Sequence, residues 1–277
     1  MDREQFARRV TVAAAWPPGD PRLFEAFLDT PREHFLPPSI PPNRVYSDAT
    51  VGLGIFGINN GQPSLHALCL AALAPQPGET AVHVGAGTGY YTAILAHLLG
   101  PQGHVEAFEI DPRLAAQAQG NLAAVPKGGV PGTGARRRSG RLQVAAISVH
   151  SSSGATAPLP ACDIVYVNCG ATGPASAWLE ALRPRGRLLF PLTGSEGSGA
   201  MLLLTRPQAD SPAWPARFLL PVAFIGCQGA RDPEEERAVT AAFDRGGAAA
   251  VRWFFRAPAA APVSCWCQTK DWSLRQA

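Results

Sequence analysis

The sequence predicts an α/β fold built on a parallel β-sheet with helices on both faces. Three observations lead to this prediction. Short, fully apolar runs recur between residues 79 and 191, segments with a helical apolar pattern separate them, and a glycine-rich turn follows the first run. Buried parallel strands appear as continuous apolar runs because helices cover both faces of their sheet. The chain has 277 residues, of which 46% are hydrophobic, so it can bury a core of this kind.

The N-terminal part predicts a helical cap that precedes the sheet. Asp20 and Pro21 are typical of the N-cap and the first position of a helix. A helix should also begin near Pro63, since the residues after it are apolar on all sides. The expected elements are helices over residues 2–15, 21–29 and 64–74, with a proline-rich connector at 36–42.

The central part predicts alternating strands and helices. The expected strands cover residues 80–84, 104–109, 142–149, 163–167 and 187–191, and the helices cover 90–99, 112–124 and 175–182. Further strands are expected at 201–205, 217–225 and 250–256, with a helix near 233–245. We therefore expect a cap with an acceptor-side segment over 1–62, a core over 63–230 and a mixed C-terminal extension over 231–277.

Composition excludes several classes of function. The net charge is 24 − 21 = +3, which is too small an excess for a typical nucleic-acid-binding protein. No apolar run approaches the ~20 residues that span a membrane, and the N-terminus lacks the pattern of a signal peptide. The six cysteines are scattered, which favours a reducing cytoplasm over a disulfide framework. We expect no metal site, since Cys265 and Cys267 lack a second pair of ligands.

One insertion, residues 126–141, is rich in glycine and arginine. A solvated loop is the simpler interpretation, and an anion-binding arm is the alternative.

A glycine-rich turn carries the strongest chemical signal. Gly85, Gly87 and Gly89 lie where an expected strand meets an expected helix, whose first amides are unpaired. Glu109 closes the next strand, where a carboxylate can accept hydrogen bonds from both hydroxyls of a ribose. This combination predicts a site for a nucleoside cofactor.

The spacing of the turn distinguishes between cofactors. Dinucleotide sites have the pattern G-x-G-x-x-G, but here Tyr90 occupies the position of the third glycine. G-x-G-x-G followed by an acidic residue resembles the S-adenosylmethionine site of class I methyltransferases, whose sheet is Rossmann-like. A nicotinamide dinucleotide and a turn without a ligand are the alternatives. The expected cofactor-binding residues are His66, His83, Gly85, Ala86, Gly87, Thr88, Gly89, Glu109, Ile110 and Ser148.

Several further stretches match one family in chain order. They are residues 31–37, 45–48, 61–67, 82–90, 105–111, 121–122, 162–167 and 182–191. Together they resemble the protein-L-isoaspartate O-methyltransferase family over roughly residues 30–193. The resemblance implies methylation of an isoaspartyl carboxylate in a protein or peptide, with S-adenosylmethionine as the methyl donor.

The sequence departs from the family pattern at three places. Asn59, Asn60 and Gly61 stand where the family has Thr-Ile-Ser beside the acceptor, so the serine hydroxyl is absent. His83 replaces an acidic residue before the first glycine. Ser148 aligns with the aspartate that follows the third strand in the family and meets the adenine amino group.

The acceptor side is expected to use short polar residues. Asn59, Asn60 and Gln62 offer amide donors and acceptors just before a helix, although asparagine and glycine are also common in plain turns. Asp48 matches a family position near the acceptor. Methyl transfer to a carboxylate needs placement and electrostatics but no general base. The alternatives are a methyltransferase for a small molecule or a dedicated peptide, and a non-catalytic cofactor-binding scaffold.

Overall fold

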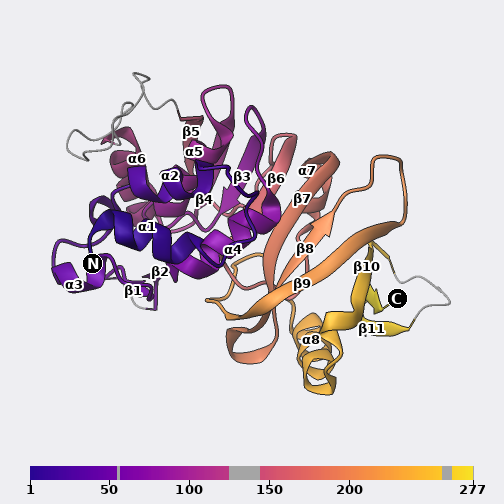
Figure 1. The fold of residues 1–277 in the computed structure, drawn as a ribbon. Helices are drawn as coiled ribbons and strands as arrows, with labels where there is room; N and C mark the ends of the chain where they lie inside the picture. Colours follow the sequence, from indigo (N-terminus) through magenta and orange to yellow (C-terminus); the bar gives the residue numbers. More distant parts are fainter. Residues whose placement is uncertain (55–56, 125–143, 258–263, 277) are drawn as a thin grey trace. The chain divides into compact units, whose positions relative to one another are not determined.

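The computed structural model describes residues 1–54, 57–124, 144–257 and 264–276. The chain divides into two compact units (Figure 1). The first unit comprises Met1–Thr80 and Ala86–Ser152, and the second comprises Ala81–Gly85 and Ser153–Ala277. The arginine-bearing insertion 126–141 lies outside the described residues. The three-part division expected from the sequence stays a prediction.

The first unit contains the helical cap and a parallel strand pair. Its elements are α1 (Arg3–Thr11), α2 (Arg22–Asp29), η1 (Arg32–Phe35), α3 (Pro42–Val45), β1 (Val51–Gly52), β2 (Asn59–Asn60), α4 (Pro63–Leu73), α5 (Tyr90–Leu99), β4 (His104–Glu109), α6 (Pro112–Ala124) and β5 (Ala146–Ser151). Strands β4 and β5 pair in parallel, and β1 pairs with β2 in antiparallel orientation. The expected helices of the cap are confirmed, although the first ends at Thr11.

Local chemistry explains where these helices begin. The Asp2 carboxylate accepts a hydrogen bond of 2.8 Å from the backbone N–H of Gln5, which caps α1. Helix α4 begins at Pro63, whose ring suits the first turn because no backbone N–H is needed there. Helix α5 is buried over nearly its whole length, as its continuous apolar sequence predicts.

Aromatic rings form much of the core of the first unit. Phe6 and Phe27 of the cap have ring centroids 6.5 Å apart, and Phe27 lies 6.5 Å from Tyr90 of α5. Phe35 packs against the same tyrosine at 5.6 Å. The cap and α5 are therefore joined by edge-to-face aromatic contacts.

Arg32 fixes the segment that leads into α4. Its side chain is completely buried. The guanidinium donates hydrogen bonds of 2.7–3.4 Å to five uncharged oxygens: the backbone carbonyls of Val45, Ser47, Ala49 and Gly61, and Oδ1 of Asn60. Burying a cation is costly unless its donors are satisfied, and here the backbone of residues 45–61 satisfies them. One side chain thus links residues 45–49 to Asn60 and Gly61.

The second unit contains a larger sheet. Its elements are β3 (Thr80–Val84), β6 (Cys162–Val167), α7 (Ser176–Ala181), β7 (Leu182–Thr193), η2 (Ser195–Gly197), β8 (Ser198–Thr205), β9 (Ala213–Ala223), α8 (Pro233–Arg245), η3 (Ala248–Ala250), β10 (Val251–Phe255), β11 (Cys265–Gln268) and β12 (Ser273–Gln276). The strand order is β11-β12-β10-β9-β8-β7-β6-β3. Strands β3, β6 and β7 are parallel, as predicted, whereas β7 to β12 pair in antiparallel orientation.

Besides the pairing of β10 with β9, Arg231 also connects the C-terminal extension to this sheet. Its guanidinium donates to the carbonyls of Gly170 and Gly194 and to the hydroxyl of Thr193, at 2.9–3.1 Å, and pairs with Glu236 of α8. In Figure 1 the orange strand β9 leads to α8 and then to the short yellow strands. The extension therefore begins with a side chain that binds the ends of the preceding sheet strands.

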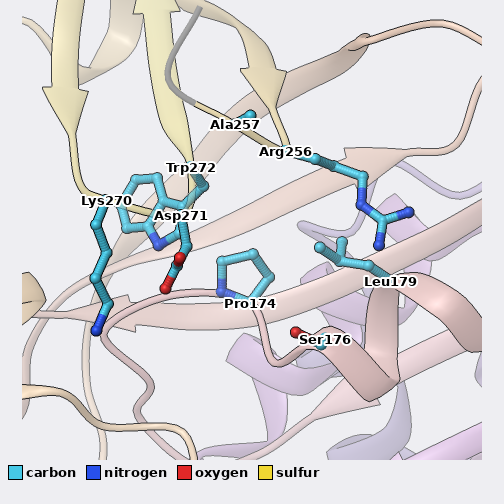
Figure 2. Close-up of a pocket in the computed structure, with 8 residues that line it drawn as sticks. All are labelled: Pro174, Ser176, Leu179, Arg256, Ala257, Lys270, Asp271 and Trp272. Atoms are coloured by element: carbon cyan, nitrogen blue, oxygen red, sulfur yellow. The ribbon is translucent and has the colours of Figure 1, made fainter.

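A cavity of about 290 Å³ in the second unit is lined by residues of the extension and by residues 174–179. Figure 2 shows Lys270, Asp271 and Trp272 on one side of Pro174, and Arg256 above Leu179 on the other. Both charge signs occur on its rim, and none of the predicted site residues lines it. No helix of the described residues is long and apolar enough to span a membrane.

Replacement of Arg32 by methionine tests how the segment before α4 is held. The Arg32→Met change leaves the carbonyls without their donor, and each stranded acceptor costs on the order of 1–3 kcal/mol. Loss of the buried charge offsets part of this cost. We expect the free energy of unfolding in urea to fall by about 3 kcal/mol. Arg8→Ala, which removes an exposed pair with Glu4, is the control and should leave the midpoint unchanged.

Candidate active site

The glycine turn lies between β3 and α5. Gly85, Gly87 and Gly89 have φ angles of 78°, 57° and 95°, a region that other residues rarely adopt. A Cβ atom at Gly89 would also lie 3.0 Å from Cγ of Leu122, so the leucine would have to shift by a few tenths of an ångström. All three predicted glycines are therefore required by the backbone itself. Gly85 belongs to the second unit, and the following residues belong to the first.

Glu109 holds the turn from the end of β4. The residue is only 7% exposed, and its carboxylate accepts hydrogen bonds from the backbone N–H groups of Gly87, at 2.8 Å, and Asp111, at 3.0 Å. Burial raises the pKa of Glu109, while the backbone amides, including that of Ile110, counteract the rise. Ile110, the next residue in the chain, is 43% exposed, so an apolar side chain at the surface follows the buried Glu109.

Thr88 and Ala86 connect the turn to its surroundings. The Thr88 hydroxyl donates to the carbonyl of Phe35 at 2.7 Å, and the Thr88 carbonyl accepts from the side chain of Asn121 at 3.0 Å. The Ala86 amide donates to the carbonyl of Phe108 in β4. The turn is thus bonded to the cap, to α6 and to β4 within the first unit, which leaves it little freedom to move.

Asn59 and Asn60 form the short strand β2, which pairs with β1. Asn59 is exposed, whereas Asn60 is only 5% exposed. The Oδ1 atom of Asn60 accepts a hydrogen bond of 3.1 Å from Arg32, so this amide supports the segment. Of these two predicted acceptor-side residues, Asn59 is the one with its side chain in solvent.

Asp48 and Gln62 meet at the start of α4. The Asp48 carboxylate accepts from the backbone N–H of Ser64 at 2.8 Å and from the Gln62 side chain at 3.4 Å. Asp48 therefore caps α4 from 16 residues away, and it places a carboxylate next to the exposed amide of Gln62. The structure brings these two predicted residues together.

His66 lies on α4 and is 2% exposed. Its ring stacks on Tyr91 of α5, with centroids 3.6 Å apart and an angle of 15° between the planes. The Tyr91 hydroxyl donates to the carbonyl of Gly61 at 2.6 Å. Arg32 and Tyr91, which sequence analysis missed as site residues, both bind this carbonyl. Neither residue type has a local signal that would have revealed these long-range contacts.

His83 lies in β3 of the second unit and is completely buried. Its ring stacks on Tyr166 at 5.3 Å, and its Nε2 is 2.7 Å from the side-chain amide nitrogen of Asn168. Burial lowers the pKa of His83 to about 3, so the ring is neutral at neutral pH. A neutral imidazole held by Asn168 thus stands where the family pattern has an acidic residue.

The end of the third expected strand requires a correction. Strand β5 spans Ala146–Ser151, so it ends two residues later than the expected bounds of 142–149. Ser148 lies inside the strand, as those bounds implied, and Ser151 is the residue in register with Glu109. The apolar run stopped at Val149, which made the strand end too early. Whether Ser148 contacts a cofactor stays a prediction.

Comparisons with known proteins place the chain in a family. The family model for protein-L-isoaspartate(D-aspartate) O-methyltransferase matches residues 18–229. A protein-L-isoaspartate O-methyltransferase of Methylorubrum extorquens is 34% identical over 206 residues, which cover 74% of this chain and 80% of that protein. One of Methanopyrus kandleri is 30% identical over 171 residues, covering 62% and 69% of the two chains.

Solved structures agree on the fold. A protein-L-isoaspartate O-methyltransferase structure aligns with a TM-score of 0.69 at 18% identity, covering 100% of this chain and 88% of that one. A second, described as a putative enzyme of this kind from Plasmodium falciparum in complex with S-adenosyl-L-homocysteine, aligns with a TM-score of 0.63 at 16% identity, covering 83% and 99%. Residues 230–277, which contain α8 and β10 to β12, lie beyond the range of the family model. The model nevertheless covers most of the sequence, and the chain belongs to the protein-L-isoaspartate(D-aspartate) O-methyltransferase family.

Proposed function

We propose that this chain transfers a methyl group from S-adenosylmethionine to the side-chain carboxylate of an isoaspartyl residue in a protein or peptide. Membership of the family supports the reaction. The observation that carries the proposal is the buried carboxylate of Glu109, which is bonded to the glycine turn at the end of a parallel strand. This function is favoured over the small-molecule acceptor and the non-catalytic scaffold.

The residues of the first unit fit an adenosyl group. Glu109 can accept hydrogen bonds from both ribose hydroxyls, and burial strengthens such bonds to a carboxylate. Gly87 lets the backbone approach a ligand without a Cβ clash, since only a leucine methyl of the cap lies near its open side. The exposed side chain of Ile110 offers an apolar contact for a flat base.

The bound donor would supply an activated methyl group on its sulfonium centre. The acceptor carboxylate is ionised at neutral pH, so the chain does not need to remove a proton. The residues of the chain only have to hold the acceptor carboxylate in line with the methyl group that is transferred. We assign this role to Asn59, whose exposed amide can donate hydrogen bonds to a carboxylate oxygen, and to Gln62, whose amide would exchange its bonds to Asp48 and Ser64 for the acceptor.

The acceptor-side segment is well fixed for this purpose. Arg32 holds its backbone, and Asp48 binds Gln62 next to the start of α4. Orientation of two reactants is effective only when the residues that orient them do not move. A cytoplasmic location remains a prediction, consistent with six free cysteines.

Incubation with labelled S-adenosylmethionine tests the reaction. An isoaspartyl peptide and its aspartyl twin are compared under the same conditions. We expect base-labile label, typical of a methyl ester, on the isoaspartyl peptide alone. A boiled enzyme sample is the control. If neither peptide gains label at a donor concentration that saturates binding, the proposed function is wrong.

Replacement of Glu109 by glutamine tests the donor site. Charge-assisted hydrogen bonds contribute on the order of 1.5–3 kcal/mol, so Glu109→Gln should weaken S-adenosylhomocysteine binding about 10–100-fold. The raised pKa of Glu109 adds a pH dependence. The ribose hydroxyls donate more strongly to the ionised carboxylate than to the protonated one. The affinity of the unmodified protein should therefore fall as the pH drops through the pKa of Glu109. Because this pKa is raised, the fall should occur at a higher pH than it would for an ordinary glutamate.

Calorimetric titration between pH 5 and 8 measures both effects. In the Glu109→Gln variant this pH dependence should be absent. Glu4→Gln, a change at an exposed glutamate of α1, is the matched control and should bind like the unmodified protein. Unchanged affinity in Glu109→Gln would mean that the ribose contact is misassigned.

A further inference from the structure

Strand β5 brings a serine to the end of the sheet where Glu109 lies. Strands β4 and β5 run parallel, and their paired Cα positions extend from His104 and Ala146 to Glu109 and Ser151. Residues that pair in adjacent parallel strands have their side chains on the same face of the sheet. The side chains of Glu109 and Ser151 therefore leave neighbouring strands on one face, about 5 Å apart.

Ser148, which the sequence analysis expected at the cofactor, occupies a different position on the same strand. It is in register with Glu106, three residues before the end of β4. Side chains alternate between the two faces of a strand, so an offset of three residues places Ser148 on the opposite face from Ser151. Ser151 is also exposed. Of these two serines, Ser151 is the one that shares both a face and a strand end with Glu109.

The contacts of β4 indicate how a nucleoside held by Glu109 would extend. The Gly87 amide donates to Glu109, and the Ala86 amide donates to the carbonyl of Phe108, so the glycine turn lies along one edge of β4. Strand β5 pairs along the other edge. A donor whose ribose hydroxyls are bonded to Glu109 has its base and its sulfonium arm at opposite ends of the sugar. One of them therefore lies toward the turn and the other toward β5.

The sulfonium arm belongs on the side of the glycine turn. The turn leads into α5, and Tyr91 of this helix donates to the Gly61 carbonyl within the proposed acceptor-side segment. The methyl group has to reach that segment, so the purine base lies on the other side, toward Ile110 and Ser151. The exposed Ile110 side chain suits the flat face of the base, and the exposed Ser151 hydroxyl suits its polar edge.

A hydroxyl and a carboxylate differ in how they bind the edge of a purine. An ionised carboxylate only accepts hydrogen bonds, whereas a serine hydroxyl both donates and accepts. The amino group of a 6-amino purine is a donor at this edge, and the oxygen of a 6-oxo purine is an acceptor. A carboxylate would therefore favour the amino group and repel the oxygen, while a hydroxyl can rotate to bond with either.

We propose that the Ser151 hydroxyl contacts the six-position of the purine base, and that the donor site therefore accepts a 6-oxo purine almost as well as a 6-amino purine. The proposal rests on the donor site of the proposed function. It gives to Ser151 the base contact that the sequence analysis gave to Ser148. Glu109 then selects the ribose, while the edge of the base is distinguished only weakly.

Binding of two nucleosides to the full chain tests the proposal. Calorimetric titration compares S-adenosylhomocysteine with S-inosylhomocysteine, which has an oxygen in place of the 6-amino group, at about pH 8, where carboxylates are ionised. The variants are Ser151→Ala, Ser151→Asp and, for the rival position, Ser148→Asp. Ser264→Asp makes the same change at an exposed serine of the C-terminal extension and is the matched control. Thermal unfolding midpoints show whether each variant is folded.

We expect the unmodified protein to bind the two nucleosides with affinities within about threefold of each other. Ser151→Ala should weaken the binding of both by about two- to tenfold, because each loses one hydrogen bond. Ser151→Asp should bind S-adenosylhomocysteine at least about tenfold more tightly than S-inosylhomocysteine. The ratio of the two affinities should stay unchanged in Ser264→Asp and in Ser148→Asp. If Ser151→Asp does not fold, the unmodified protein and Ser151→Ala still decide.

Three results would overturn the proposal. The first is a preference of the unmodified protein for S-adenosylhomocysteine of more than about tenfold, which would leave the proposed function intact. The second is full affinity for both nucleosides in Ser151→Ala, or a changed ratio in Ser148→Asp and not in Ser151→Asp. The third is that the unmodified protein binds neither nucleoside, in which case the donor site and the proposed function fail as well.

Discussion

The hydrogen bond between the Gly87 amide and the Glu109 carboxylate organises the first unit. It joins the glycine turn to the end of β4 across 2.8 Å, and it uses a carboxylate that is almost completely buried. The neighbouring contacts depend on the shape of this turn, which positions Gly89 against Leu122 and the Thr88 hydroxyl against the cap. A buried carboxylate is tolerated because backbone amides donate to it. Glu109 can accept further hydrogen bonds, and we propose that the ribose hydroxyls of S-adenosylmethionine donate them.

A second buried charge organises the acceptor-side segment. Arg32 donates to the carbonyls of residues 45, 47 and 49 and to the side chain of Asn60, and so it links the stretch before β1 to β2. Both charges follow one rule: an isolated buried ion persists where the backbone supplies its hydrogen bonds. The proposed function would use these two hydrogen-bonded segments, one for each reactant, in a reaction that depends on orientation.

Much of this site could be predicted from the sequence because its signals are local. Alternating apolar runs located the parallel strands, and the spacing from the glycines to Glu109 indicated a nucleoside site. Long-range contacts could not be predicted. Nothing local reveals that Asp48 caps α4, that Asn60 bonds to Arg32 or that His66 fills the space beside Gly61. The antiparallel pairing after β7 could not be predicted either, since the apolar pattern of a strand does not show which strand it pairs with.

The most direct measurement is a crystal structure of the protein with S-adenosylhomocysteine bound. The account predicts that the ribose hydroxyls lie about 2.6–3.2 Å from the Glu109 carboxylate oxygens, with the Gly87 amide still bonded to the same residue. A nucleoside bound elsewhere on the chain, or a Glu109 side chain that makes no contact with the ribose, would contradict it.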